Sequence, residues 1–223
     1  MPLKTPEEYV ESLRALQIRA YVGGERVDSI VDSPLIAPHI NTAAKTYELA
    51  HRPEHRDVMT AESHLTGERI HRYTHIFQSA DDLVKKIQML RLLGQVTGTC
   101  FQRCVGLDAL NAAYAISYEV DEAQGTDYHE RFKRYLEMVQ REDLMLAGAM
   151  TDPKGHRGRR PSEQADPDAF VRVVERRPDG GAIRGAKLHN AGGINSHEVL
   201  VLPGTGLIEG EEDYAIACAV PAD

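Results

Sequence analysis

Apolar residues recur at helical spacing through the first two-thirds of the chain. Tyr9, Leu13 and Leu16 repeat every three or four positions behind Thr5, a residue type that caps helices, and this arrangement predicts a first helix. The same periodicity predicts four more helices: over about residues 38–50, from Ser79 along an apolar stripe of Leu83, Ile87, Leu90 and Leu93, from about Thr99 to Ala123, and from Asp127 to Leu146.

Near Gly148 the pattern changes to short apolar runs between turn residues. It predicts strands over residues 170–175, 181–188, 199–202 and 214–221, with a turn at Arg177, Pro178, Asp179 and Gly180 between the first two. Within the helical part, Gly23 and Gly24 indicate a hairpin over residues 21–27, and residues 65–73 are expected to be extended. We therefore expect an α+β chain with a helical domain over residues 1–147 and a β domain over residues 148–223.

The predicted β domain is small for an independent unit. Four strands can barely bury a hydrophobic core, and the last of them runs almost to Asp223. We therefore expect further sequence or a partner to complete this domain.

Composition places the chain among soluble globular proteins. Of its 223 residues, 42% are hydrophobic and 27% charged, and no stretch approaches the roughly 20 apolar residues of a membrane span. The net charge of −8 argues against a nucleic-acid partner, and the polar N-terminus lacks the apolar core of a signal peptide. Three cysteines do not suggest a disulfide framework, so a reducing, cytoplasmic location is expected.

Cys100 and Cys104 are the first candidates for chemistry. On a helix that begins near Thr99 they would lie one turn apart, with Cβ atoms about 5–6 Å from each other, which suits a shared metal or iron–sulfur cluster better than a disulfide. Thr97 or Thr99 could cap this helix, Arg103 could offset thiolate charge, and the helix N-terminus would lower the thiol pKa. The alternative is that both cysteines, like Cys218 in the last strand, are core residues.

A second candidate for metal binding is a histidine-rich tract. Five of the ten histidines lie between residues 51 and 75, and His71 and His75 stand four residues apart. The alternative is that these are polar loop residues without a ligand.

Two polar, glycine-containing loops beside predicted strands could hold a cofactor. In residues 150–160, Lys154 and Arg157 could neutralise a diphosphate, and in residues 187–198 the backbone N–H groups near Gly192 and Gly193 could approach a flat ring. No helix-opening G-x-G-x-x-G follows a strand, so this is not a dinucleotide fingerprint. The alternative is two solvated surface connections.

Three of these segments together resemble a known family. Residues 97–106, 148–155 and 194–198 resemble the 4-hydroxybutyryl-CoA dehydratases, which are also vinylacetyl-CoA Δ-isomerases and belong to the 4-hydroxyphenylacetate 3-hydroxylase flavoproteins. The resemblance implies an acyl-CoA-dehydrogenase-like architecture, in which a helical N-terminal domain precedes an antiparallel β middle domain, here incomplete, and a C-terminal helical bundle that this chain lacks. It also implies FAD and a [4Fe–4S] cluster.

The resemblance assigns roles to individual residues. Cys100 and Cys104 match two cluster ligands, and the family's other two lie on the C-terminal helices. At Ala191 the dehydratases carry a threonine whose hydroxyl faces the flavin, and alanine cannot donate that hydrogen bond. The positions that match flavin-contacting segments are Met150, Thr151, Asp152, Lys154, Gly155, Arg157, His189, Asn190, Ala191 and Gly192.

The implied reaction removes water from 4-hydroxybutyryl-CoA or isomerises vinylacetyl-CoA. It requires an acyl-CoA substrate and a C-terminal half or subunit, and the family favours homo-oligomers. One alternative is a flavin-dependent aromatic hydroxylase that uses reduced FAD and oxygen without iron. The other is an inactive truncated remnant whose cysteines are core.

Overall fold

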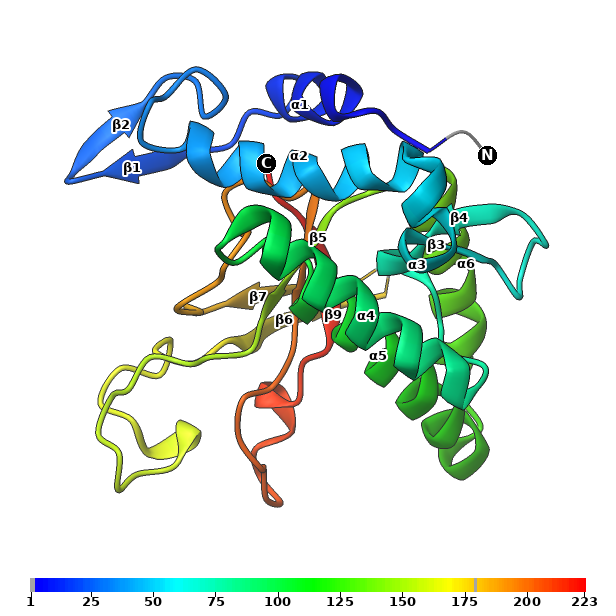
Figure 1. The fold of residues 1–223 in the computed structure, drawn as a ribbon. Coiled ribbons are helices and arrows are strands. Elements are labelled where there is room, and N and C mark those ends of the chain that lie inside the picture. Colours follow the sequence, from blue (N-terminus) through cyan, green and yellow to red (C-terminus); the bar gives the residue numbers. More distant parts are fainter. Residues whose placement is uncertain (1–2, 179) are drawn as a thin grey trace.

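The computed structural model describes residues 3–178 and 180–223 as an α+β fold (Figure 1). Within this range the helices are α1 (Pro6–Arg14), α2 (Ala37–His51), α3 (Arg56–Met59), α4 (Ala80–Thr97), α5 (Cys104–Gln124) and α6 (Tyr128–Arg141). The strands are β1 (Ala20–Val22), β2 (Glu25–Val27), β3 (Thr60–Glu62), β4 (Arg69–His71), β5 (Leu146–Ala149), β6 (Arg172–Arg177), β7 (Gly180–Arg184), β8 (Glu198–Val201) and β9 (Cys218–Pro221). None of these helices is long and apolar enough to cross a membrane.

The first helix forms as its sequence predicts. The Thr5 hydroxyl accepts a hydrogen bond from the Glu8 N–H at 3.1 Å, and the Glu8 carboxylate accepts one from the Thr5 N–H at 2.8 Å, which completes a capping box. Tyr9 and Leu13 are fully buried, and the Tyr9 ring stacks on Tyr47 of α2 with 4.6 Å between ring centroids. The predicted hairpin, now β1 and β2, and the predicted helix α2 are also present.

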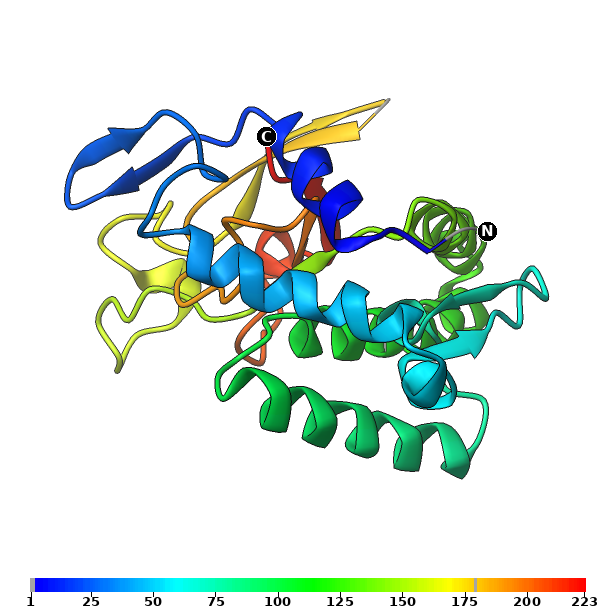
Figure 2. The same cartoon turned by 45° about the horizontal axis from the view of Figure 1, so that its top comes forward.

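Helix α4 begins at the predicted cap, but its predicted apolar stripe is only partly buried. The Ser79 hydroxyl accepts a hydrogen bond from the Asp82 N–H at 3.3 Å. Leu83 and Ile87 are 50% and 62% exposed, whereas Met89 and Leu93 are fully buried. The helix therefore packs through a face centred on Met89 and Leu93, with Leu90 partly buried beside them. Only Leu83 and Ile87, half of the predicted stripe, lie on exposed surface. Figure 2 shows α4 at the margin of the helical part.

The boundaries around α5 and α6 differ from the predicted ones. Gly98 ends α4 in the left-handed conformation with φ of 63°, and α5 begins only at Cys104, not near Thr99. Neither Thr97 nor Thr99 caps α5, because the position before its first residue is Arg103, which makes no side-chain cap. After α6 ends at Arg141, residues 146–149 form the buried strand β5 instead of the predicted last helical turn.

The strands do not form one antiparallel sheet. Strand β8 lies between β5, to which it is parallel, and β9, to which it is antiparallel, while β6 and β7 form a separate antiparallel hairpin. The pairing of β5 with β8 corrects the expected purely antiparallel arrangement. The hairpin turn includes Asp179, which lies outside the described residues. Of residues 65–73, only β4 is a strand, paired with the unpredicted β3.

Helix α5 crosses strand β5 with almost no space between their backbones. A Cβ atom at Gly106 would overlap the Leu146 carbonyl oxygen and lie 3.0 Å from the Leu146 carbonyl carbon. A Cβ atom at Gly148 would overlap the Val105 side chain. Each element therefore presents a glycine to the other, and this contact fixes the start of α5 against the sheet.

Helix α1 is attached to the sheet through buried polar groups. The ring of His197 accepts a hydrogen bond from the Met145 N–H at Nδ1, at 2.9 Å. Its Nε2 lies 2.8 Å from the Ser12 hydroxyl, which itself donates to the Tyr9 carbonyl at 2.7 Å. The Tyr9 hydroxyl donates to the Asn195 carbonyl at 2.7 Å. Because Nδ1 accepts and Nε2 donates, the ring fits this position only when it is neutral.

We predict that Gly106→Ala destabilises the fold by about 2 kcal/mol, because the methyl group forces α5 away from β5. Urea unfolding measures this change. Gly94→Ala on α4 is the matched control: no atom lies within 4 Å of its Cβ position, so this variant should be up to about 1 kcal/mol more stable than the parent. An unchanged midpoint for Gly106→Ala would contradict the close crossing.

A second prediction concerns pH. Burial above all, and then the charges of Lys4 and Arg103, lower the pKa of His197 to about 4. Because the unfolded chain has a histidine pKa near 6.5 and so binds the proton more readily, stability falls as the pH drops from about 6.5 to 4, by up to about 3 kcal/mol. In His197→Gln this part of the pH dependence should disappear from urea unfolding curves. A variant curve parallel to that of the parent would contradict the assignment.

Candidate functional site

The two candidate cysteines lie at the junction of α4 and α5, but not on one helical face. Cys100 is exposed in the loop over residues 98–103, and Cys104 is the half-buried first residue of α5. Burial above all, and then the nearby Cys100, raise the pKa of the Cys104 thiol. The expected lowering by the helix N-terminus is therefore wrong: backbone N–H groups favour the thiolate, and burial outweighs them.

Arg103 has a role different from the expected one. Its side chain is 1% exposed, and its guanidinium carbon lies 4.4 Å from the Tyr47 ring centroid and 4.7 Å from that of Tyr73. One of its nitrogens donates to the Thr46 hydroxyl at 2.9 Å. Arg103 is thus a cation held between two aromatic rings in the core, and it ties α2 to the start of α5.

The two polar loops that the sequence marks as candidates meet at their bases. The Leu188 N–H donates to the Thr151 carbonyl at 2.8 Å. Met150 and Leu188, on either side of this hydrogen bond, are 46% and 39% exposed. The junction therefore offers apolar surface beside polar backbone, which is the combination that a flat heteroaromatic ring requires.

The second of these loops also touches the cysteine loop. Gly192 is buried with φ of 85°, and a Cβ atom there would lie 3.0 Å from the Gln102 carbonyl oxygen and 3.3 Å from the Met145 methyl group. Gln102 itself has φ of 70°, a conformation that is uncommon outside glycine. Three segments that are far apart in the sequence, around residues 102, 151 and 190, thus form one continuous region.

Two polar atoms of this region lack partners. The side-chain oxygens of Gln102 and Asn190 are buried and have no hydrogen-bond partner. Buried side-chain atoms without partners also occur elsewhere in the described residues, for example at Tyr73 and Asp143. The two oxygens are therefore free acceptors beside the loops, but they do not by themselves define a ligand site.

Most of the residues predicted to contact the flavin are accessible. Asp152 and Asn190 are half-buried, Gly192 is buried, and the exposed positions are Met150, Thr151, Lys154, Gly155, Arg157, His189 and Ala191. Lys154 and Arg157 have no ion-pair partner within the described range, so their charges are available to an anion.

Sequence reasoning missed the residues that shape the first loop. The Gln164 amide nitrogen donates to the carbonyls of His156 and Arg159 at 3.2 and 3.1 Å, and its oxygen accepts from the His156 N–H at 2.9 Å. Glu211, 2% exposed, accepts from Arg160 at 2.5 Å. Because Gln164 follows the loop at no fixed motif spacing and Glu211 lies about 50 residues beyond it, the sequence pattern contains no signal for either contact.

Over residues 3–178 and 180–223, no group of three or more His, Cys, Asp or Glu side chains is arranged to hold a metal. In the histidine tract, His71 is buried and lies 3.0 Å from the Thr46 carbonyl, and His75 lies 3.0 Å from Asp82. Cys218 packs against the small core cluster of Ala149, Val201 and Ile216, as expected of a core residue. Any cluster on Cys100 and Cys104 therefore requires ligands from outside the described residues.

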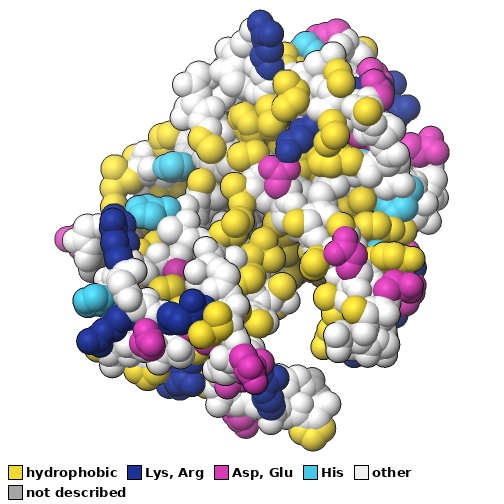
Figure 3. Space-filling view, turned by 90° about the horizontal axis from the view of Figure 1, so that it is seen from below, with side chains coloured by type: hydrophobic (Ala, Val, Ile, Leu, Met, Phe, Trp, Pro, Cys, Tyr) yellow, Lys and Arg dark blue, Asp and Glu magenta, His cyan; other side chains and the backbone are white. Residues whose placement is uncertain are grey.

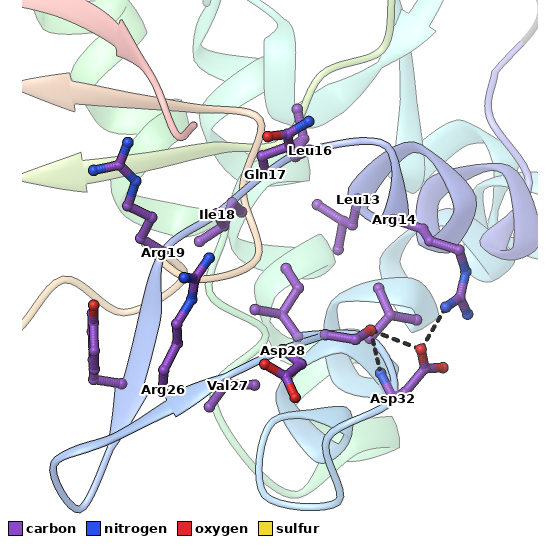
Figure 4. A pocket seen from close by; sticks show the side chains of 14 residues that line it. Leu13, Arg14, Leu16, Gln17, Ile18, Arg19, Arg26, Val27, Asp28 and Asp32 are labelled. Atoms are coloured by element: carbon purple, nitrogen blue, oxygen red, sulfur yellow. Dashed lines mark hydrogen bonds and ion pairs between the residues drawn. The ribbon is translucent and has the colours of Figure 1, made fainter.

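Three hollows in the described surface contain none of the candidate cysteines and no residue of the two polar loops, although His75 lines one of them. One of about 730 Å³ lies between the end of α1 and the β1–β2 hairpin, where Arg14 pairs with Asp32 at 2.6 Å (Figure 4). Its lining includes Arg19 and Arg26, and it holds neither a cysteine nor a residue of the polar loops. The candidate cysteines and polar loops thus lie outside these three hollows.

The chain matches the family model described as 4-hydroxyphenylacetate 3-hydroxylase N terminal over residues 5–223. It is 52% identical over 221 residues to the 4-hydroxybutyryl-CoA dehydratase/vinylacetyl-CoA Δ-isomerase of Clostridium aminobutyricum. The matched region covers 99% of this chain and 45% of that protein. It is 31% identical over 219 residues to the oxygenase component of a 4-hydroxyphenylacetate 3-monooxygenase from Thermus thermophilus, covering 98% and 44%.

The similar solved structures also include both dehydratases and monooxygenase oxygenase components. An oxygen-tolerant archaeal 4-hydroxybutyryl-CoA dehydratase from N. maritimus matches with a TM-score of 0.96 and 48% identity, over 99% of this chain and 44% of that chain. The oxygenase component of 4-hydroxyphenylacetate 3-monooxygenase complexed with FAD matches with a TM-score of 0.83 and 30% identity, over 98% and 44%. This chain thus spans less than half the length of these relatives. It belongs to the 4-hydroxyphenylacetate 3-hydroxylase family, of which it represents the N-terminal region.

Proposed function

We propose that this chain is the N-terminal part of a 4-hydroxybutyryl-CoA dehydratase/vinylacetyl-CoA isomerase that depends on FAD and a [4Fe–4S] cluster. The observation that carries the proposal is the convergence of the cysteine loop with both polar loops, through Gly192 against Gln102 and Leu188 against Thr151. The higher identity to dehydratases (52% and 48%) than to monooxygenases (31% and 30%) favours this chemistry within the family.

FAD fits the residues of the two polar loops. Lys154 and Arg157 would neutralise its diphosphate, and the exposed apolar surface of Met150 and Leu188 would support its ring. Ala191 is exposed in the same segment and has no hydroxyl to donate. When bound, FAD supplies one-electron chemistry that side chains lack.

The cysteines fit two of the four positions of a cluster. Cys100 is accessible, Cys104 is half-buried beside it, and the remaining ligands would come from the C-terminal part of the protein. Because burial raises the pKa of Cys104, its thiol would lose its proton as iron binds. When bound, the cluster supplies Lewis acidity at the leaving hydroxyl of the substrate.

In this proposal the chain's own residues bind the two cofactors and orient them relative to each other. The loops hold the flavin side of the site, Cys100 and Cys104 hold the iron side, and the α5–β5 crossing fixes the distance between them. The acyl-CoA substrate would lie between these two sides. No acid or base is assigned among the described residues.

The proposed C-terminal part would find a surface on α4 on which to pack. Leu83, Val84, Ile87 and Val96 of α4 are each about half exposed. Figure 3 shows hydrophobic side chains gathered around a hollow on the underside of the molecule. A C-terminal helical bundle in an acyl-CoA-dehydrogenase-like arrangement, within a homo-oligomer, would cover such a surface.

A second candidate is a flavin-dependent aromatic monooxygenase component. The match to a FAD-complexed oxygenase with a TM-score of 0.83 favours it. This candidate predicts flavin without iron.

The test is metal and flavin analysis of the full-length protein prepared without oxygen. We expect FAD and about four irons per site, the content of one [4Fe–4S] cluster. Cys100→Ser and Cys104→Ser should each lower iron to near zero and leave the protein folded, because each removes one of the two thiolate ligands. Cys218→Ser is the matched control and should keep its iron. Retention of the cluster in either of the first two variants would refute the ligand assignment, and flavin without iron in the parent would support the monooxygenase.

A further inference from the structure

We infer that Lys187 is a positioning residue that fixes the two flavin-holding loops relative to each other. This inference rests on the proposed function, and it assigns to the site a residue that does not itself contact the cofactor. It is argued from the hydrogen bonds of one buried ammonium group.

The Lys187 side chain is 8% exposed, and its ammonium has three acceptors. It lies 2.5 Å from the Asp152 carboxylate, 2.8 Å from the Leu202 carbonyl and 3.1 Å from the Met150 carbonyl. An ammonium has three N–H donors, so all of them are used. Two of these acceptors belong to the start of the first loop, and the third follows β8.

The partner carboxylate is mostly buried as well. Asp152 is 12% exposed, and a Cβ atom at Gly204 would lie 2.5 Å from one of its oxygens. A glycine at position 204 is therefore needed for Asp152 to occupy this place. Asp152 acts as the partner of Lys187, which distinguishes it from the exposed loop residues Lys154 and Arg157.

Lys187 also sets the position of the second loop. The next residue, Leu188, pairs with Thr151, and a tight turn follows at once: His189 has φ of 57°, and the Ala191 N–H donates to its carbonyl at 3.1 Å. A shift of Lys187 would thus move residues 189–192 relative to residues 150–152. Its removal would also leave the Asp152 charge partly buried without a partner.

The experiment measures FAD affinity in the full-length protein by titrating the apoprotein. Lys187→Met should weaken FAD binding about tenfold to hundredfold, because both loops lose their common attachment. It should also change the visible circular dichroism of the flavin at saturating FAD, which reports ring geometry. Lys187→Arg should restore part of the affinity. The matched control is Lys85→Met near the start of α4. It breaks surface ion pairs with Asp57 at 2.9 Å and Asp81 at 3.3 Å and should bind FAD like the parent.

The outcomes separate the two claims. If the parent binds FAD, and Lys187→Met binds it equally well and with the same dichroism, the inference is overturned. A lower melting temperature of that variant would then show that Lys187 has a structural role only. If the parent does not bind FAD, both the proposed function and the inference fail. Should Lys187→Met not fold, Asp152→Asn removes the ionic partner more gently, and unchanged FAD affinity there would equally overturn the inference.

Discussion

The close crossing of α5 on β5 is the contact on which the rest of the structure depends. Because Gly106 and Gly148 have no side chains, the helix and the strand approach to backbone contact distance. This contact sets where Cys104 starts its helix and where β5 delivers the chain into the first polar loop. The cysteines on the iron side of the proposed site and the first polar loop on its flavin side are thus both connected to this packed junction.

Buried polar residues complete this junction. Arg103 is held between Tyr47 and Tyr73, and His197 connects Met145 to Ser12 of α1. A buried cation between rings and a neutral buried histidine both have demanding surroundings, since desolvation is costly unless partners are present. These contacts explain the structural value of Arg103 and of the motif around Asn195 and His197, which resemblance alone would assign to function.

Much of the fold could be predicted from sequence where local rules decide. Thr5 with Glu8, and Ser79 with Asp82, determine helix starts through their own hydrogen bonds, and the predicted strands near residues 170 and 199 have clear apolar patterns. Prediction was wrong where the local signal was ambiguous. The helical pattern predicted to run on to Leu146 ends at Arg141, and Leu146 instead begins β5, where pairing with β8 buries it. Leu83 and Ile87 of α4 were predicted to be core but are exposed, because apolar periodicity does not reveal whether another segment packs against a helix face.

The sequence by itself determined the α+β class and the caps of α1 and α4, and it singled out the two cysteines and the two polar loops as candidates, because these depend on residue type and short spacing. Only the tertiary structure decided that Cys100 lies outside the helix, that Arg103 is a core cation, and that Lys187 joins the loops. Those outcomes depend on contacts between residues far apart in the sequence, such as Lys187 with Asp152 and Arg103 with Thr46. Local periodicity cannot encode such contacts, since they arise only once glycines allow helix and sheet to meet.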